Sequence, residues 1–340
     1  MKNNDISRRK FLGTTALATA GITLLSKSSF GVPAFIENLG KPNSLFKGVQ
    51  IGVVSYSWRS LPSGAEQILQ YCLDSNISAI ELTGLTVEEF AGIPMMPVTP
   101  APTGNAPAAS PGGGRGAQLT PEQRAQRAEF AKKVAEWRAN VPMTKFEQLG
   151  KMYNKAGVKI YGFKPSALGV MNTDAEIDFA FRATKALGGN QTTLEIQDAA
   201  QSKRVGEIAA KNKVYAAYHG HLQQTLTAWD VALSQSKYNV INFDMGHYVA
   251  AGNDPIPFLE AKHNHILSMH LKDRKNKANG GANMPWGQGD APITQVLQLM
   301  SKNKWKFPAS IEMEYPVPAG SDAVKETAKC VEFARKALGA

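Results

Sequence analysis

The stretch N-V-I-N-F-D-M-G-H at residues 239–247 and the stretch I-L-S-M-H-L-K-D-R at residues 266–274 decide the fold. Each begins as a nearly continuous apolar run, which is typical of a buried parallel strand. Each run ends in ionisable residues: Asp244 and His247 on the first, and His270, Lys272 and Asp273 on the second. Because α/β proteins place their chemistry where such strands end, this part of the chain predicts a site as well as a fold.

The same alternation of strand and helix extends through most of the chain. Strands are predicted at 48–55, 78–83, 158–163, 191–196, 214–219, 240–244, 266–271 and 309–314. Helices are predicted at 65–75, 120–139, 144–156, 174–187, 199–212, 225–236, 255–262, 293–303 and 323–338. Repeated βα units imply a parallel sheet, and eight of them predict a single-domain (β/α)8 TIM barrel over residues 46–338. The alternative is an open doubly wound sheet, but no G-x-G-x-x-G follows the first strand.

Composition narrows the classes of function. The 340 residues are 43% hydrophobic and 19% charged, which suits one large barrel or two smaller domains. The net charge is +10, but no block of five or more basic residues occurs, so we expect no nucleic-acid partner. The two cysteines, Cys72 and Cys330, lie in helix-like segments far apart in the sequence, where a buried apolar role is expected and no cysteine-based metal motif exists.

The N-terminus has the pattern of a targeting signal. Ser7-Arg-Arg-Lys-Phe-Leu12 precedes an apolar run at 13–25, which is typical of twin-arginine export and too short to span a bilayer. Residues 1–35 are therefore predicted to be an export signal and linker, with the twin-arginine machinery as partner and an exported, periplasmic location. The alternative is a surface helix, although the run has no polar face. Cleavage of the signal and its retention as an anchor both stay open.

Residues 92–119 form a second segment that is not expected to join the barrel. They are rich in Pro, Gly and Ala and include S-P-G-G-G-R-G at 110–116. Such a composition does not pack a core, so a flexible insertion is predicted.

The ends of the last five predicted strands all carry polar side chains. They are Glu195, His219 and His221, Asp244 and His247, His270 and Lys272, and Glu312 and Glu314. In a barrel these ends meet at one mouth. Burying so many titratable groups without a counter-charge costs several kcal/mol each, so we expect a divalent metal ion among them. Glu81 ends the second strand, where a substrate contact or an ordinary ion pair is expected.

Five motifs of the second half resemble the xylose isomerase-like TIM barrels, a family of sugar phosphate isomerases and epimerases. They are Y-H-G-H at 218–221, D-M-G-H at 244–247, H-L-K-D at 270–273, P-W-G-Q-G at 285–289 and S-I-E-M-E at 310–314. The D-x-G-H, H-x-K-D and I-E pieces are weak alone and specific together in this order. The resemblance covers residues 48–338 and implies the same barrel.

The resemblance also implies one divalent metal, which is Mn, Zn, Co or Mg. It puts three ligands at Asp244, His270 and Glu312. Relatives carry a glutamate as the first ligand, where this chain has His219. Either His219 takes that place and makes the site richer in nitrogen, or Glu195 reaches in from the preceding strand.

The roles of the surrounding residues follow from the same resemblance. Two metal-bound glutamates serve as the acid and base in relatives; here Glu312 matches directly and Glu195 is the candidate for the second. Lys272 or His247 is expected to polarise a substrate oxygen. Substrate contacts are expected at His221 and Trp286 from the resemblance, and at Glu81 from its position at the end of the second strand.

We therefore expect a metal-dependent sugar isomerase or epimerase. A metal bound to a carbonyl and its neighbouring hydroxyl acidifies the proton between them and stabilises an enediolate. Export argues for a non-phosphorylated sugar or keto-sugar as the substrate. Three alternatives remain: a 3-keto-glycoside lyase that acts by β-elimination, a non-catalytic sugar-binding barrel, and an enzyme that cleaves abasic DNA, which needs more metal ligands. A homo-oligomer is compatible with the sequence.

Overall fold

The computed structural model describes residues 40–96 and 120–340. The export signal at 1–35 and most of the insertion at 92–119 lie outside the described residues, so both stay predictions. Among the described helices, none combines the length and apolar character that crossing a bilayer requires.

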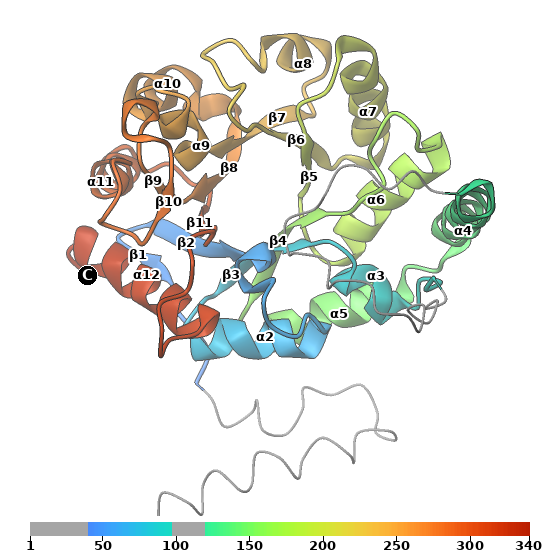
Figure 1. The fold of residues 1–340 in the computed structure, drawn as a ribbon, viewed down its shortest axis with the longest axis horizontal. Coiled ribbons are helices and arrows are strands. Elements are labelled where there is room, and N and C mark those ends of the chain that lie inside the picture. The colour runs from blue at the N-terminus through green and yellow to red at the C-terminus, as the bar shows by residue number, and fades with distance from the viewer. Residues whose placement is uncertain (1–39, 97–119) are drawn as a thin grey trace, which may run out of the picture.

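A closed barrel of eight parallel strands forms the centre of the described chain (Figure 1). The strands are β2 (Val49–Val54), β3 (Ala79–Thr83), β4 (Lys159–Lys164), β5 (Gln191–Glu195), β6 (Tyr215–His219), β7 (Asn239–Asp244), β8 (Ile266–Leu271) and β11 (Ala309–Ile311). Pairing of β2 with both β3 and β11 closes the circle. The short strand β1 (Leu45–Phe46) pairs antiparallel with β2, and β9 (Asp273–Arg274) pairs with β10 (Asn283–Met284). The predicted (β/α)8 TIM barrel is confirmed.

Helices surround the barrel (Figure 1). They are α2 (Ala65–Asp74), α3 (Thr86–Ala91), α4 (Pro121–Asn140), α5 (Thr144–Lys155), α6 (Asp174–Ala186), α7 (Ala199–Asn212), α8 (Asp230–Gln235), α9 (Met245–Ala250), α10 (Pro255–Lys262), α11 (Ile293–Asn303) and α12 (Ala323–Ala337). The start predicted for α4 is confirmed, because Thr120 and Gln123 form a capping box ahead of Pro121.

The alternation of side chains along each strand separates the core from the site. On β7, Phe243 points outward and stacks on Phe258 of α10, with ring centroids 4.3 Å apart. Asn242 and Asp244 have the opposite parity and face the barrel interior. The register pairs Asp244 with His270 of β8, so the polar ends of neighbouring strands meet at one level.

Three local features differ from the expectation. Helix α8 begins at Asp230 rather than 225, because the Trp229 indole is buried and donates to the Tyr218 carbonyl (2.8 Å), which anchors the chain ahead of the helix. Helices α3 and α9 were not predicted, and both have only six residues. Strand β11 ends at Ile311 rather than 314, so Glu312 and Glu314 follow the strand.

A buried ion cluster fastens α4 to the barrel. Arg138 is 4% exposed; its Nε lies 2.7 Å from Glu88 Oε1 and its Nη1 lies 3.2 Å from Glu176 Oε1. The same guanidinium donates to Ser166 Oγ (3.0 Å). One side chain thereby connects helices α3, α4 and α6.

Arg138→Met is expected to lower the free energy of unfolding by about 3–5 kcal/mol, because it leaves Glu88 buried without its counter-charge. Urea denaturation measures the loss. Arg127→Met is the matched control on the same helix, where the side chain is exposed. Losses within about 1 kcal/mol of each other would contradict this role for Arg138.

Candidate metal centre

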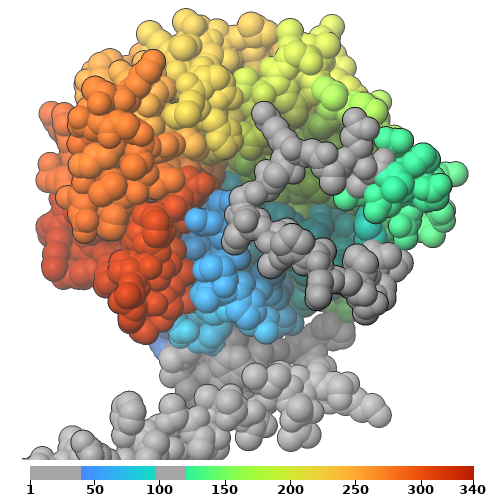
Figure 2. Space-filling view, viewed as in Figure 1, coloured from blue at the N-terminus to red at the C-terminus, as the bar shows by residue number. Residues whose placement is uncertain are grey.

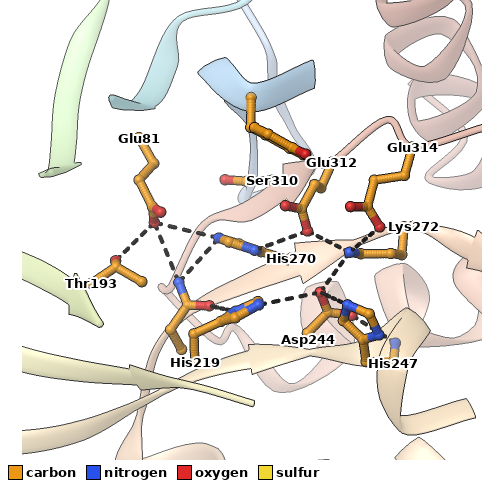
Figure 3. A network of polar contacts seen from close by, with 12 residues as sticks. Glu81, Thr193, His219, Asp244, His247, His270, Lys272, Ser310, Glu312 and Glu314 are labelled. Atoms are coloured by element: carbon orange, nitrogen blue, oxygen red, sulfur yellow. Dashed lines mark hydrogen bonds and ion pairs between the residues drawn. The ribbon is translucent and has the colours of Figure 1, made fainter. Parts of the chain in front are cut away.

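Four buried side chains converge at the mouth of the barrel. They are His219 from β6, Asp244 from β7, His270 from β8 and Glu312 just after β11 (Figure 3). One ligand atom from each lies within 4.8 Å of those of the other three. Asp244 is 0% exposed and Glu312 8%, so Glu312 is the carboxylate of this group that keeps some access to solvent.

The contacts within this group suit a metal ion. His219 Nε2 lies 3.8 Å from Asp244 Oδ2, and His270 Nδ1 lies 3.2 Å from Glu312 Oε2. Asp244 Oδ1 accepts the backbone N–H of His247 (2.7 Å), but Asp244 Oδ2 is buried without a well-directed hydrogen bond. Two imidazole nitrogens with two carboxylate oxygens are good donors for a borderline divalent cation. The four residues could therefore hold such an ion.

Lys272 supplies a positive charge beside this group. Its Nζ lies 3.0 Å from Asp244 Oδ2, 2.7 Å from Glu312 Oε2 and 2.7 Å from Glu314 Oε2. Although burial opposes it, the three carboxylates raise the pKa of Lys272 above its ordinary value. The ammonium group stays charged and balances the carboxylates, and each of its three protons has a carboxylate acceptor nearby.

Burial and charge shift the pKa values of the four residues in different directions. Burial lowers the pKa of His219 well below its ordinary value, and the charge of His270 adds to this. At His270 burial acts the same way, but Glu312 and Glu81 outweigh it and raise the pKa to about 10. Burial raises the pKa of Asp244 to about 6, against the opposing charge of Lys272. In the protein as described, His219 is neutral and His270 is protonated at pH 7.

A chain of polar contacts runs along the mouth beside this group. Glu195 lies 2.6 Å from Lys164 Nζ through Oε1 and 2.9 Å from His221 Nε2 through Oε2. His221 Nδ1 lies 3.1 Å from His247 Nε2, and His247 Nδ1 lies 2.7 Å from Arg274 Nη1. Since arginine only donates, the His247 proton lies on Nε2 and points to His221, whose own proton then points to Glu195.

The direction of this chain decides how its members behave. One ring nitrogen from each of His219, His221 and His247 also lies within 4.8 Å of the others. Because His247 Nε2 carries the proton, it cannot bind a metal, and this favours a hydrogen-bond chain over a three-histidine metal site. Although burial opposes it, the His221 bond and the Lys164 charge lower the pKa of Glu195. The bond to Glu195 raises the pKa of His221, and burial lowers that of His247 to about 3.

His219 and Glu195, the two candidates for the first metal ligand, lie in different surroundings. His219 lies with Asp244, His270 and Glu312, whereas the Glu195 carboxylate is directed to Lys164 and His221. Two of the expected substrate contacts lie elsewhere. Glu81 is 0% exposed and meets His270 from deeper in the barrel, and the Trp286 ring packs edge-on against Phe333 of α12, 5.8 Å away.

Three residues of the site were not anticipated. Lys164 ends β4 and Arg274 lies in β9, both at the mouth. Asn242 precedes Asp244 by two positions and faces the same way, and it contacts both histidines of the metal group. The parity of Asn242 and the position of Lys164 at a strand end were signals visible in the sequence.

Comparison with known proteins assigns the family of this chain. The profile described as "Xylose isomerase-like TIM barrel" matches residues 113–336. The chain belongs to this family. The resemblance seen in the motifs of the second half is thereby confirmed.

The proteins that this chain resembles in sequence or in fold include two named as dehydratases and one named as an epimerase. An inosose dehydratase of Clostridium botulinum is 26% identical over 131 residues, which cover 33% of this chain and 44% of that protein, less than half of its length. Two solved structures share the fold. The probable 3-DHS dehydratase of Bacillus anthracis has a TM-score of 0.55 at 13% identity, with 84% of this chain and 98% of that chain covered. The D-allulose 3-epimerase of Methylomonas sp. has a TM-score of 0.54 at 12% identity, with 88% and 99% covered.

Proposed function

We propose that this protein is a divalent-metal-dependent sugar isomerase or epimerase that acts on a non-phosphorylated sugar or keto-sugar. The observation that carries the proposal is the buried group of His219, Asp244, His270 and Glu312 at the barrel mouth. Membership of a family whose solved relatives include a D-allulose 3-epimerase supports it. When bound by these four side chains, a divalent cation supplies Lewis acidity to a substrate carbonyl and its neighbouring hydroxyl.

In this proposal, side chains at the barrel mouth transfer the protons. Glu312 keeps some access to solvent and is our candidate to remove the proton next to the carbonyl. The low pKa of Glu195 makes it a weak base, so we assign it to hold His221, whose side chain is 49% exposed. His221 follows β6 and Glu312 follows β11, and β7 and β8 lie between these two strands in the barrel. The two side chains thus approach the substrate from two sides. His221 then returns a proton to the substrate, which yields the epimer or the isomer; His221 regains its proton from solvent and Glu312 loses its proton to solvent, so both groups are reset.

A lyase is the second candidate. It would begin with the same proton removal and then expel a substituent one carbon further on, as in β-elimination from a 3-keto-glycoside. The names of two relatives, an inosose dehydratase and a probable 3-DHS dehydratase, favour it, since a dehydratase expels water. Both candidates use the same site, and product analysis distinguishes them.

We further propose that the protein is exported by the twin-arginine route and works in the periplasm. The paired arginines Arg8 and Arg9 before an apolar run support this. The location in turn supports a non-phosphorylated substrate.

Exchange of substrate hydrogen with solvent tests the proposed chemistry. We expect protein reloaded with Mn, Co or Zn to incorporate deuterium from heavy water next to the carbonyl of at least one free ketose or 3-keto-glycoside. Nuclear magnetic resonance identifies the carbon and the product, which is an epimer, an isomer or an elimination product. Glu312→Gln is expected to slow this exchange by about 10²–10⁴-fold. Metal-loaded protein that binds such a sugar but exchanges nothing would instead be a sugar-binding barrel.

The pH dependence of metal binding follows from His270. Its pKa of about 10 means that the imidazole carries an extra proton at pH 7.5, and a metal ion must displace it. We expect about one proton released per metal bound above pH 7, and an affinity that rises about tenfold per pH unit up to about pH 10. Calorimetry in two buffers of different ionisation enthalpy measures the release. An affinity that levels off above pH 7 would contradict the raised pKa.

A further inference from the structure

The barrel interior beneath the metal group is unusually polar. Seven side chains, each at most 5% exposed, lie there: Glu81, Tyr161, Gln191, Thr193, Asn242, Ser268 and Ser310. Barrels of this type normally fill this space with bulky branched apolar residues. Burial of a carboxylate such as that of Glu81 is costly unless its hydrogen bonds are satisfied. The proton-transfer scheme above makes no use of this carboxylate.

Glu81 Oε2 is the point where the interior contacts meet. Thr193 Oγ1 donates to it at 3.0 Å, and His270 Nε2 lies 3.4 Å away (Figure 3). Asn242 Nδ2 also donates to it, at 3.3 Å. A carboxylate accepts hydrogen bonds and does not donate them. Every group that faces Glu81 Oε2 therefore presents a proton to it.

Because Glu81 only accepts hydrogen bonds, it also affects which nitrogen of His219 carries the proton. Asn242 connects the two residues. The amide nitrogen of Asn242 faces Glu81 Oε2 and also donates to Ser268 Oγ at 2.7 Å, so its oxygen Oδ1 faces the other way, 2.9 Å from His219 Nδ1. The amide oxygen only accepts, so His219 Nδ1 carries a proton. The nitrogen left to bind a metal ion is then Nε2, which lies 3.8 Å from Asp244 Oδ2.

The same carboxylate orients His270 directly. A proton on Nε2 points to Glu81, which leaves Nδ1 as the nitrogen directed to Glu312 Oε2, 3.2 Å away. Asn242 Nδ2 also approaches His270 Nε2 at 3.2 Å, but both groups are donors there and form a packing contact only. Each histidine thus directs one defined nitrogen to a carboxylate of the metal group: His219 directs Nε2 to Asp244, and His270 directs Nδ1 to Glu312.

We propose that Glu81 is the positioning residue of the metal centre: it selects Nδ1 of His270 directly and Nε2 of His219 through Asn242. The inference rests on the proposed function, because it presumes that the four residues bind a metal. A carboxylate that accepts the second N–H of a metal-bound histidine fixes the ring orientation and strengthens the ligand. Here one carboxylate does so for His270 directly and acts on His219 through the amide of Asn242.

Metal affinity tests the proposal without reference to catalysis. Glu81→Gln keeps the shape of the side chain but offers an amide that no longer demands a donor from both neighbours. We expect its dissociation constant for Zn or Co to rise about 10–100-fold, with a shifted visible spectrum of the Co form. Asn242→Leu interrupts the path to His219, keeps the direct contact of Glu81 with His270 and removes the hydrogen bond to Ser268 Oγ; it is expected to weaken binding about tenfold.

Thr193→Val is the matched control, since Thr193 donates to the same oxygen of Glu81 but contacts neither histidine. Its affinity is expected to stay within about threefold of wild type. Affinity of Glu81→Gln equal to that of the control would overturn the positioning role while leaving the proposed function intact. If Glu81→Gln does not fold, the same comparison with Asn242→Leu decides. A reloaded wild type that binds no metal would overturn both proposals together.

Discussion

Asp244→Asn is expected to weaken metal binding by at least about a hundredfold, because loss of even an outer partner of a ligand costs 10–100-fold. The substitution keeps the side-chain shape and the oxygen that caps α9 through the His247 N–H. It removes the charge at Oδ2, the buried oxygen that faces His219 and Lys272. We expect the exchange of substrate hydrogen with solvent to fall by about 10³-fold as well.

A second aspartate of the same chain provides the control for this variant. Asp254 caps α10 as Asp244 caps α9, with Oδ1 accepting the Ile256 N–H at 2.9 Å, but it lies in an exposed position away from the metal group. Asp254→Asn should leave metal affinity unchanged. Competition against a chromophoric chelator measures both variants. If Asp244→Asn bound metal as tightly as Asp254→Asn, Asp244 would not be a ligand.

Lys272→Met is expected to lower the free energy of unfolding of the metal-free protein by about 3–5 kcal/mol. The lysine is buried among Asp244, Glu312 and Glu314, and its loss leaves these carboxylates without their counter-charge. A divalent cation would restore positive charge at the same place. We therefore expect added metal to recover most of the lost stability and to bind more tightly to this variant than to wild type.

Chemical denaturation with and without metal distinguishes this account from a simple packing defect. A packing defect would cost the same in both conditions. Lys275→Met is the control, because Lys275 lies three residues away in a half-exposed pair with Asp290 (3.6 Å), where about 1 kcal/mol or less is expected. An equal loss in metal-free and metal-loaded Lys272→Met would contradict a shared charge-balancing role for the lysine and the cation.

The barrel could be predicted from sequence because its signals are local. Each strand is a short apolar run, and the helices between the strands have their own caps, such as Thr120 before α4. Helix α9 was not predicted, because it has only six residues and the side chain that caps it, Asp244, is also a candidate metal ligand. A helix this short carries too few residues to show a period.

The site was predictable only in part. The strand ends indicate which residues gather, and His219, Asp244, His270 and Glu312 do lie together. The sequence does not reveal the lateral contacts that set their chemistry. Asn242 lies between β6 and β8, and its amide nitrogen faces Ser268 on β8 and Glu81 on β3, of which Glu81 is far away in the chain. The charge of Lys272 likewise depends on three carboxylates, those of Asp244 at the end of β7 and of Glu312 and Glu314 just after β11.

Metal content of the purified protein tests the central claim most directly. After reloading with Mn, Zn, Co or Mg and removal of excess metal, elemental analysis should find about one equivalent per chain in wild type and much less in His270→Ala. His263→Ala is the control histidine, stacked on Trp305 with ring centroids 4.9 Å apart, and it should retain the metal. If reloaded wild type held no more metal than His270→Ala, the four side chains would not form a metal centre, and a sugar-binding role would replace the proposed enzyme.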